Sequence, residues 1–261
     1  MKNTHHDIPP ALLQALHQAR RVVVFTGAGV SAESGIATFR DALTGLWSRF
    51  DAQALATPEA FREHPDVVWG WYEWRRAQAL RAKPNAAHRA IAELARHVPE
   101  LAVVTQNVDD LHERAGSARV THLHGSLHAP RCSACAAPQA FAAEHPDEPD
   151  GGRRIAPPAC ARCRAPVRPG VVWFGESLPA EAWNSAWRAV QACDLLFSIG
   201  TSALVYPAAE LPQRALASGA TVVQINPAAT PLDAHAHHNL RGAAADVMPR
   251  LLAAAGFGLA V

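Results

Sequence analysis

A glycine-rich segment directly after an apolar run is the feature that most constrains the fold of this chain. The apolar run is Val22 to Phe25, and the segment after it, Gly27 to Arg40, reads GAGVSAESGIATFR. Gly27, Gly29 and Ala32 fit the spacing G-x-G-x-x-G/A, in which glycines allow a tight turn and bring backbone N–H groups close to a pyrophosphate. The sequence therefore predicts a strand that ends in a phosphate-binding loop.

The residues after this loop argue against a simple dehydrogenase. An ordinary dinucleotide-binding unit continues into a helix and a second strand, which ends in Asp or Glu about 20 residues further on. This chain instead continues into Ser34 to Asp41, a polar stretch that Gly35 interrupts. We therefore expect a nucleotide site that is not built for hydride transfer.

Strand and helix patterns alternate along the rest of the chain. Apolar runs predict five strands, at residues 22–25, 101–105, 120–123, 194–199 and 221–225. Helical patterns occur at 11–20, 58–64, 65–81, 86–97, 179–192, 207–218 and 243–255. This alternation predicts an α/β fold with a doubly wound parallel sheet.

Ligands of such sheets bind beyond the carboxyl ends of the strands, where this chain carries polar residues. These strand-end residues are Gly27, Gln106, His124, Gly200 and Asn226. We expect them to meet at one edge of the sheet. His235, His237 and His238 are expected in a solvated loop, and His88 is expected to be a hydrogen-bonded structural histidine.

Two cysteine pairs lie in a proline-rich region whose composition differs from that of the rest of the chain. Cys132 and Cys135 form one C-x-x-C, Cys160 and Cys163 form another, and 24 residues separate the pairs. Each C-x-x-C turn places two thiolates on one side of a tetrahedral ion, so the two pairs predict a closed structural Zn²⁺ site. Disulfides or a redox pair are the alternatives; a reducing compartment and the matched pairs disfavour them. We interpret 131–169 as an inserted zinc module.

Composition excludes several other classes of protein. The chain has 261 residues with a formal net charge of +1 and no clustered basic surface, so nucleic acid is not an expected partner. No apolar run approaches the ~20 residues that cross a bilayer, and the start lacks the layout of a signal peptide. We therefore expect no membrane partner and a cytoplasmic protein.

The motifs, taken in order, resemble those of the sirtuins, the NAD-dependent protein deacylases. The matching segments are Gly27–Arg40, Gln106–Asp109, His122–Gly125, the two cysteine pairs, Val171–Glu176 and Gly200–Ser202. The resemblance implies one catalytic domain over 1–261, with a large Rossmann-like NAD-binding part at about 9–130 and 170–261. It also implies that NAD is consumed as a co-substrate and that proteins carrying acyl-lysine are the partners.

The resemblance assigns roles to individual residues. His124 and Asn107 are the expected catalytic residues, with His124 as general base; the residues alone do not choose between His124 and His122. The expected NAD-binding residues are Gly27, Ala28, Gly29, Ser31, Phe39, Arg40, Gln106, Asn107, Asp109, Gly200, Thr201, Ser202, Asn226 and Ala244. The expected contacts to the substrate backbone are Val172, Phe174, Gly175 and Glu176.

Tyr72 and Arg75 lie three residues apart on a predicted helix and so share one face. This Tyr-x-x-Arg spacing resembles that of class III sirtuins, which remove malonyl and succinyl groups. The resemblance implies that both side chains bind the acyl carboxylate. Guanidinium and carboxylate form a two-pronged bond. The helical segment at about 57–98 is then expected to line the acyl pocket, and Ala42 to leave room for the acyl group. The alternative from spacing alone is that Arg75 covers the helix surface and Tyr72 packs with neighbouring tryptophans.

Two other functions fit the same motifs. One is an NAD-dependent protein ADP-ribosyltransferase, which differs only in the acceptor. The other is a non-catalytic sensor of NAD or ADP-ribose, against which the presence of His124 argues.

Overall fold

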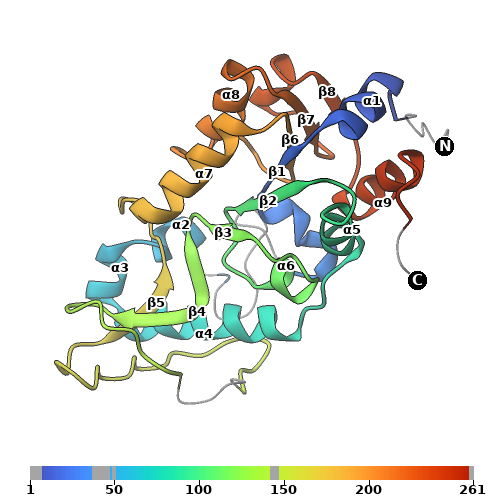
Figure 1. The fold of residues 1–261 in the computed structure, drawn as a ribbon. Coiled ribbons are helices and arrows are strands. Elements are labelled where there is room, and N and C mark those ends of the chain that lie inside the picture. The colour runs from blue at the N-terminus through green and yellow to red at the C-terminus, as the bar shows by residue number, and fades with distance from the viewer. Residues whose placement is uncertain (1–7, 37–47, 49–50, 142–146, 259–261) are drawn as a thin grey trace.

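The fold was analysed in a computed structural model, which describes residues 8–36, 48, 51–141 and 147–258 (Figure 1). Phe39, Arg40 and Ala42, which the sequence analysis placed in the cofactor loop and at the acyl pocket, lie outside the described residues.

The larger part of the molecule is a six-stranded parallel sheet, with the strand order β3-β2-β1-β6-β7-β8. The strands are β1 (Arg21–Thr26), β2 (Glu100–Thr105), β3 (Val120–His122), β6 (Leu195–Ile199), β7 (Thr221–Ile225) and β8 (His238–Leu240). The chain builds outward from β1 in one direction and from β6 in the other, so the order reverses between these neighbours. The predicted doubly wound fold is confirmed.

His235 and His237 are exposed in a loop, as expected, but strand β8 corrects the expectation of a solvated loop for His238. His238 begins the strand, pairs with Val223, and is followed by the buried Leu240. The Nδ1 atom of His237 accepts the backbone N–H of Val222 at 3.1 Å. A three-residue strand with one buried apolar side chain is too short to show an alternating pattern in the sequence.

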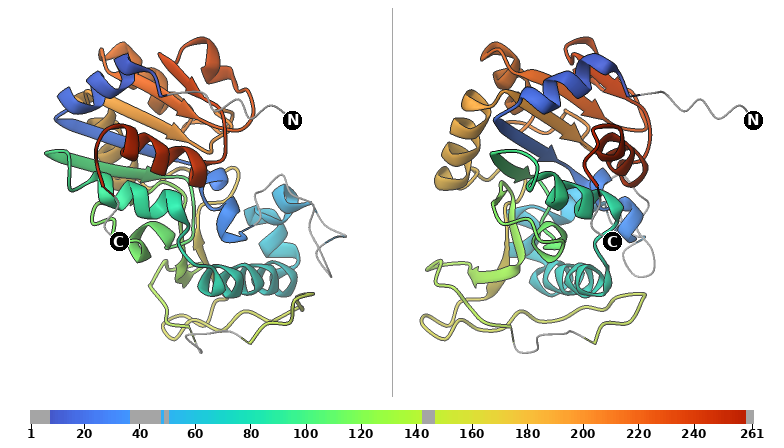
Figure 2. Two further views of the ribbon diagram at one scale, coloured as in Figure 1. Left: turned by 90° about the vertical axis from the view of Figure 1, so that its right-hand side faces the viewer. Right: turned by 45° about the vertical axis from the view of Figure 1, so that its right-hand side comes forward.

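Helices cover both faces of the sheet (Figures 1 and 2). In β1, Val22 and Val24 pack into one core and Val23 and Phe25 into the opposite one, as the two-residue period of a strand requires. The first core contains α1 (Pro10–Gln18), α5 (Ala86–Leu94) and α9 (Ala244–Ala254). The second contains α7 (Ala180–Ala192) and α8 (Glu210–Ala217).

A second, smaller assembly packs below the sheet and has its own apolar core. It contains α2 (Ala52–Leu55), α3 (Pro58–Glu63), α4 (Pro65–Arg81) and an antiparallel pair of strands, β4 (Gly125–Cys132) and β5 (Val167–Val171). The side chain of Thr57 accepts the backbone N–H of Ala60 at 3.1 Å and so caps the start of α3. In α4, the buried Trp69, Trp71 and Tyr72 anchor the helix in this core.

Short elements complete the connections. They are the 3₁₀ helices η1 (Ala28–Val30), η2 (Ala32–Ser34) and η4 (Pro231–Ala234), and the four-residue helix α6 (Leu111–Arg114). Within the described ranges, every helix is too short or too polar to span a bilayer.

Candidate active site and metal centre

The loops after β1 and β6 meet at the point where the strand order reverses. Gly29 donates its N–H to the carbonyl of Gly200 at 2.9 Å, and a Cβ on Gly29 would lie 2.7 Å from the Gly200 Cα. Gly200 has φ +60°, and a Cβ there would lie 2.5 Å from the Val30 nitrogen. The glycines are therefore required by the packing of one loop on the other, in addition to any contact with phosphate.

The residues that follow β2, β6 and β7 are hydrogen-bonded to each other. The amide of Gln106 donates to Thr201 Oγ1 at 2.9 Å, and the amide of Asn226 donates to the Thr201 carbonyl at 2.8 Å. The predicted strand-end residues Gln106, Thr201 and Asn226 thus meet at one edge of the sheet. Ser202 follows Thr201, and Ala244 is the buried first residue of α9.

Three more of the predicted residues form a buried polar cluster. Asn107 Nδ2 donates to Ser31 Oγ at 3.1 Å, and Ser31 Oγ donates to Asp109 Oδ2 at 3.1 Å. Burial raises the pKa of Asp109 above its ordinary value, although hydrogen bonds from the Leu111 N–H and the Ser31 hydroxyl oppose this shift. Residues from two separate loops therefore hold one amide and one carboxyl in fixed positions.

His124 is held in the tautomer that a general base needs. Its Nδ1 lies 2.9 Å from the carbonyl oxygen of Gln106. A carbonyl only accepts, so Nδ1 carries the proton and Nε2 of the neutral ring carries the lone pair. Burial lowers the pKa of His124, although the Gln106 carbonyl opposes this shift. The ring is therefore neutral at pH 7, with Nε2 able to accept a proton.

His122 is not equivalent to His124, although His122 is the last residue of β3 and His124 lies two residues further on. Its Nδ1 lies 3.0 Å from the Asn107 carbonyl, and its Nε2 lies 2.7 Å from Glu113 Oε1. Burial lowers the pKa of His122, but the bonds to Glu113 and to the Asn107 carbonyl outweigh burial and raise it overall. Both nitrogens of His122 therefore face acceptors, which makes it a poor base and separates the two histidines that the residues alone could not.

Tyr72 and Arg75 lie together on α4, as predicted from their spacing. The guanidinium carbon of Arg75 lies 5.0 Å from the centre of the Trp71 ring and 5.5 Å from that of Tyr72. The indole N–H of Trp173 donates to the Tyr72 hydroxyl at 3.0 Å. Burial lowers the pKa of Arg75, while Tyr72 and Asp109 oppose this shift. The guanidinium of Arg75, the hydroxyl of Tyr72 and the neighbouring aromatic rings therefore lie together at one partly dehydrated site.

The segment after β5 was predicted to contact the substrate backbone. The Val172 N–H donates to the His124 carbonyl at 2.8 Å, and the Phe174 N–H donates to the Ala56 carbonyl at 2.9 Å. The Phe174 side chain is 44% exposed. Glu176 turns inward instead: its carboxylate accepts from Arg168 at 2.9 Å and from the Trp173 N–H at 2.8 Å. Gly175 makes the turn between them with φ +85°.

The four cysteines of the two pairs converge on one point. Their Sγ atoms all lie within 4.8 Å of one another, with separations of 3.3 Å for Cys132 and Cys163 and 3.9 Å for Cys135 and Cys160. A tetrahedral Zn²⁺ with Zn–S bonds of about 2.3 Å requires sulfur separations near ~3.8 Å. The N–H groups of Cys135 and Ala134 donate to Cys132 Sγ and lower its pKa to about 6. The cluster fits a closed structural zinc site, and all five cysteines are free of disulfides.

Removing the metal from this cluster should unfold the smaller assembly. The thiolates would repel one another without the ion, and structural zinc contributes about 10 kcal/mol or more in small zinc modules. We expect Cys160→Ser to lower the melting temperature by more than about 10 °C and to abolish the binding of one zinc per chain. Metal analysis and thermal unfolding check this, with Cys193→Ala as control because that buried thiol lies outside the cluster and donates to the Val190 carbonyl at 3.3 Å. An unchanged melting temperature after zinc loss would contradict a structural role.

Several residues around the cluster of Ser31, Asn107 and Asp109 were not predicted from the sequence. Thr26, Thr105 and His112 are buried and hydrogen-bonded to one another beneath it. His88 was expected to be structural; its Nδ1 accepts the Asn85 N–H at 3.3 Å in the cap of α5. Its Nε2 also lies 3.5 Å from Ser31 Oγ. The position of His112, three residues after Asp109, was the one available signal.

The buried histidines should make stability sensitive to acid. Burial lowers the pKa of His88 to about 4 and that of His112 to about 3, against about 6.5 in the unfolded chain. Between pH 6.5 and pH 4 the unfolded state therefore binds more protons, and stability falls as pH falls. Each histidine should cost on the order of 2 kcal/mol at pH 5. Urea unfolding at pH 7 and pH 5 checks this; an equal drop in a His88→Gln, His112→Gln variant would contradict it.

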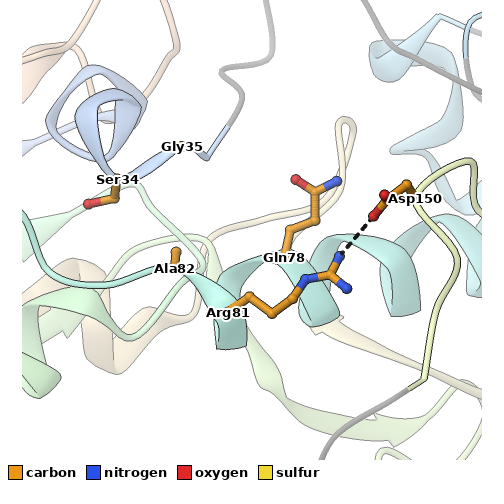
Figure 3. A pocket seen from close by; sticks show the side chains of 6 residues that line it. All are labelled: Ser34, Gly35, Gln78, Arg81, Ala82 and Asp150. Carbon is orange, nitrogen blue, oxygen red and sulfur yellow. Dashed lines mark ion pairs between the residues drawn. The ribbon is translucent and has the colours of Figure 1, made fainter.

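A cavity of about 390 Å³ lies apart from this chemistry (Figure 3). It is lined by Ser34, Gly35, Gln78, Arg81, Ala82 and Asp150, and Arg81 and Asp150 form an ion pair at 3.9 Å across it. Gln78, Arg81 and Ala82 belong to the segment 57–98 that was expected to line the acyl pocket, but none of the six described lining residues is among those named individually for NAD or the acyl group. The cavity is polar and open to solvent.

The strand order, the polar residues at the reversal and the cysteine cluster define a Rossmann-type α/β protein with a metal module. Comparison with known proteins then gives the family. A model of the Sir2 family matches residues 27–207. The chain belongs to this family, the sirtuins.

Individual relatives cover nearly the whole chain. A protein of Methylococcus capsulatus named NAD-dependent protein deacylase is 66% identical over 243 residues, which are 93% of this chain and 95% of that protein. A crystal structure of a Sir2 homologue in complex with NAD is 44% identical, with a TM-score of 0.87 and 98% of each chain covered. A structure of Sir2 bound to an acetylated peptide is 30% identical, with a TM-score of 0.80, covering 95% of this chain and 98% of that one.

Proposed function

We propose that this protein is an NAD-dependent protein-lysine deacylase that acts on acetyl-lysine and also on acyl groups with a terminal carboxylate. One observation carries the catalytic part: the Gln106 carbonyl fixes the proton of His124 on Nδ1 and leaves Nε2 as the base. His124 follows β3, which pairs with β2, and Gln106, Asn107 and Asp109 follow β2 at the same sheet edge. The relatives that bind NAD or an acetylated peptide support the same assignment.

The other strand-end residues would hold NAD. We assign the pyrophosphate to Gly27, Ala28, Gly29 and Ser31, and the riboses to Gln106, Asn107, Thr201, Ser202 and Asn226, with Asp109 at the nicotinamide and Ala244 at the adenine. When bound, NAD supplies an electrophilic ribose that accepts the acyl group after nicotinamide leaves. His124 would take the proton of the ribose hydroxyl, a step typically worth ~10² to 10⁴ in rate.

The acidic-acyl part rests on the contact between Trp173 and Tyr72. Because the Tyr72 oxygen accepts the indole N–H at 3.0 Å, its own O–H remains to donate to another acceptor. Arg75 lies beside it in a partly dehydrated place, where its positive charge attracts an anion more strongly than it would in water. A malonyl, succinyl or glutaryl carboxylate would supply that anion.

The domain arrangement follows from the same proposal. Residues 1–261 would form one catalytic domain, with the NAD-binding part at about 9–130 and 170–261 and the zinc module at about 131–169. The helices between 57 and 98 would line the acyl pocket, and Val172, Phe174, Gly175 and Glu176 would form the edge that meets the substrate backbone. Pairing with a peptide backbone gives affinity with little sequence discrimination.

Mass spectrometry of the products tests this function. The protein is incubated with NAD and with peptides carrying acetyl-, malonyl-, succinyl- or glutaryl-lysine. Free lysine, nicotinamide and an acylated ADP-ribose support the proposal. ADP-ribose attached to the peptide or to the protein would instead support a transferase, and unreacted NAD would support a sensor.

A further inference from the structure

A buried chain of hydrogen bonds leads from His112 on α6 to the backbone of Asn107. His112 Nε2 lies 3.0 Å from Thr26 Oγ1, which donates to Thr105 Oγ1 at 2.8 Å. Thr105 Oγ1 accepts the Asn107 N–H at 3.0 Å. The exposed fractions are 0% for both threonines and 1% for His112, so water does not compete for these bonds.

The direction of this chain fixes the tautomer of His112. A hydroxyl has one hydrogen, and that of Thr26 is donated to Thr105, so Thr26 must accept from His112. Burial lowers the pKa of His112 to about 3, so the ring is neutral and has a single N–H, on Nε2. His112 therefore donates from Nε2 at one end of this chain of hydrogen bonds, which we call the relay and which consists of His112, Thr26 and Thr105.

Packing alone does not account for a histidine at this position. Nδ1 of His112 is buried and makes no hydrogen bond with any residue in the described ranges. An unsatisfied buried acceptor costs about 1–3 kcal/mol, and an apolar ring of similar shape would avoid that cost. The Nε2 donor is the property that an apolar ring lacks.

Asn107 is held from three directions, and the relay is one of them. Its N–H is fixed by Thr105, its carbonyl accepts from His122 Nδ1 at 3.0 Å, and its side chain donates to Ser31. Asp109, two residues further on, receives the Ser31 hydroxyl. A rotated Thr105 hydroxyl would therefore displace the backbone that carries both the amide and the carboxyl.

We propose that His112 is a positioning residue for the sirtuin reaction, which acts through Thr26 and Thr105 to hold Asn107 where it meets the ribose of NAD. This inference rests on the proposed function, because the orientation of Asn107 affects the rate only if NAD binds at this sheet edge. His112 itself would touch neither NAD nor the acyl-lysine.

Three substitutions test the relay. His112→Phe removes the donor, Thr26→Val removes the hydroxyl that passes it on, and His112→Gln keeps an amide N–H near the position of Nε2. We expect the first two to lower kcat for nicotinamide release about 10- to 100-fold with KM for NAD changed by less than about threefold, because a small displacement of a catalytic group is costly. His112→Gln should stay within about threefold of wild type. Ser198→Ala controls for loss of a buried hydroxyl in the neighbouring strand β6.

A comparison of the double variant with the two single variants distinguishes a relay from a general loss of stability. The double variant His112→Phe, Thr26→Val should be no slower than either single variant, because both break the same chain. Multiplying losses would overturn the proposal, as would a His112→Gln variant as slow as His112→Phe. Should His112→Phe not fold, Thr26→Val carries the comparison alone, since it preserves a β-branched side chain in β1.

A measurement without turnover keeps this test independent of the proposed function. Proton–nitrogen correlation spectra of histidine-labelled wild type should show His112 protonated at Nε2 at pH 7, and Thr26→Val should shift the Asn107 amide resonance. A proton on Nδ1 of His112, or an unmoved Asn107 amide, would overturn the relay. A wild type that releases nicotinamide but leaves acyl-lysine intact would instead overturn the proposed function, and the relay would still be read from nicotinamide release.

Discussion

His124→Ala should reduce NAD-dependent deacylation about 10² to 10⁴-fold while the protein stays folded. The side chain supplies a neutral imidazole at this edge whose Nε2 is left to accept a proton, because Nδ1 is committed to the Gln106 carbonyl. His122 cannot replace it, since both of its nitrogens face acceptors and its pKa is raised. Steady-state kinetics with an acyl-peptide, together with the melting temperature, measures both parts of this expectation.

An exposed histidine gives the matched control for that experiment. His235→Ala makes the same change at an exposed position after η4, and its rate should equal that of wild type. A His124→Ala protein with near wild-type turnover would remove His124 from the mechanism. A large fall in melting temperature would show that the ring is needed for folding instead.

Arg75→Met should change the choice of acyl group more than the overall rate. Without the guanidinium, a succinyl carboxylate would be buried without its partner, at a cost on the order of 2 to 4 kcal/mol, or ~30- to 1,000-fold in kcat/KM. An acetyl group has no carboxylate, so deacetylation should persist or improve. The ratio of kcat/KM for succinyl- and acetyl-peptides is the quantity to measure.

The same substitution elsewhere on α4 provides the control. Arg81→Met changes an exposed arginine near the end of the helix, and the ratio should not move. Tyr72→Phe should lower the ratio more weakly, and it should also cost stability, because the Trp173 indole would lose its acceptor. An equal loss on both peptides in Arg75→Met would show that Arg75 supports the fold rather than the acyl carboxylate.

The sequence predicted the sheet well because parallel buried strands leave long apolar runs. Segments such as Val22 to Phe25 and Leu195 to Ile199 are buried on both faces, so their composition identifies them without any partner. The strand-end rule then placed Gln106, Gly200 and Asn226 at one edge, and hydrogen bonds from Gln106 and Asn226 to Thr201, the residue after Gly200, join them in the structure. The metal cluster could be predicted for a similar reason, because the spacing within each C-x-x-C pair is a local property of the sequence.

The paired strands β4 and β5 could not be predicted in the same way. Their sequences, GSLHAPRC and VRPGV, contain proline and glycine, which are uncommon in strands. They pair across the zinc module, so contacts distant in the sequence determine them. The relay could not be predicted for another reason. In the sequence, Thr26 and Thr105 are ordinary β-branched strand residues, and the contact between their hydroxyls exists only because β1 and β2 lie side by side.

The ribbon of β4 and β5 joins two centres that share no residue. Gly125, next to His124, begins β4, and Cys132 of the metal cluster ends it, so eight residues connect them over roughly 25 Å. Val172, one residue beyond β5, donates its N–H to the His124 carbonyl, while Val167 at the other end pairs with Cys132. The cysteine cluster therefore fixes one end of this strand pair, and the other end holds His124, the proposed general base. Oxidation or alkylation of the four clustered thiols, which lie far from any substrate, should therefore lower the rate of the enzyme.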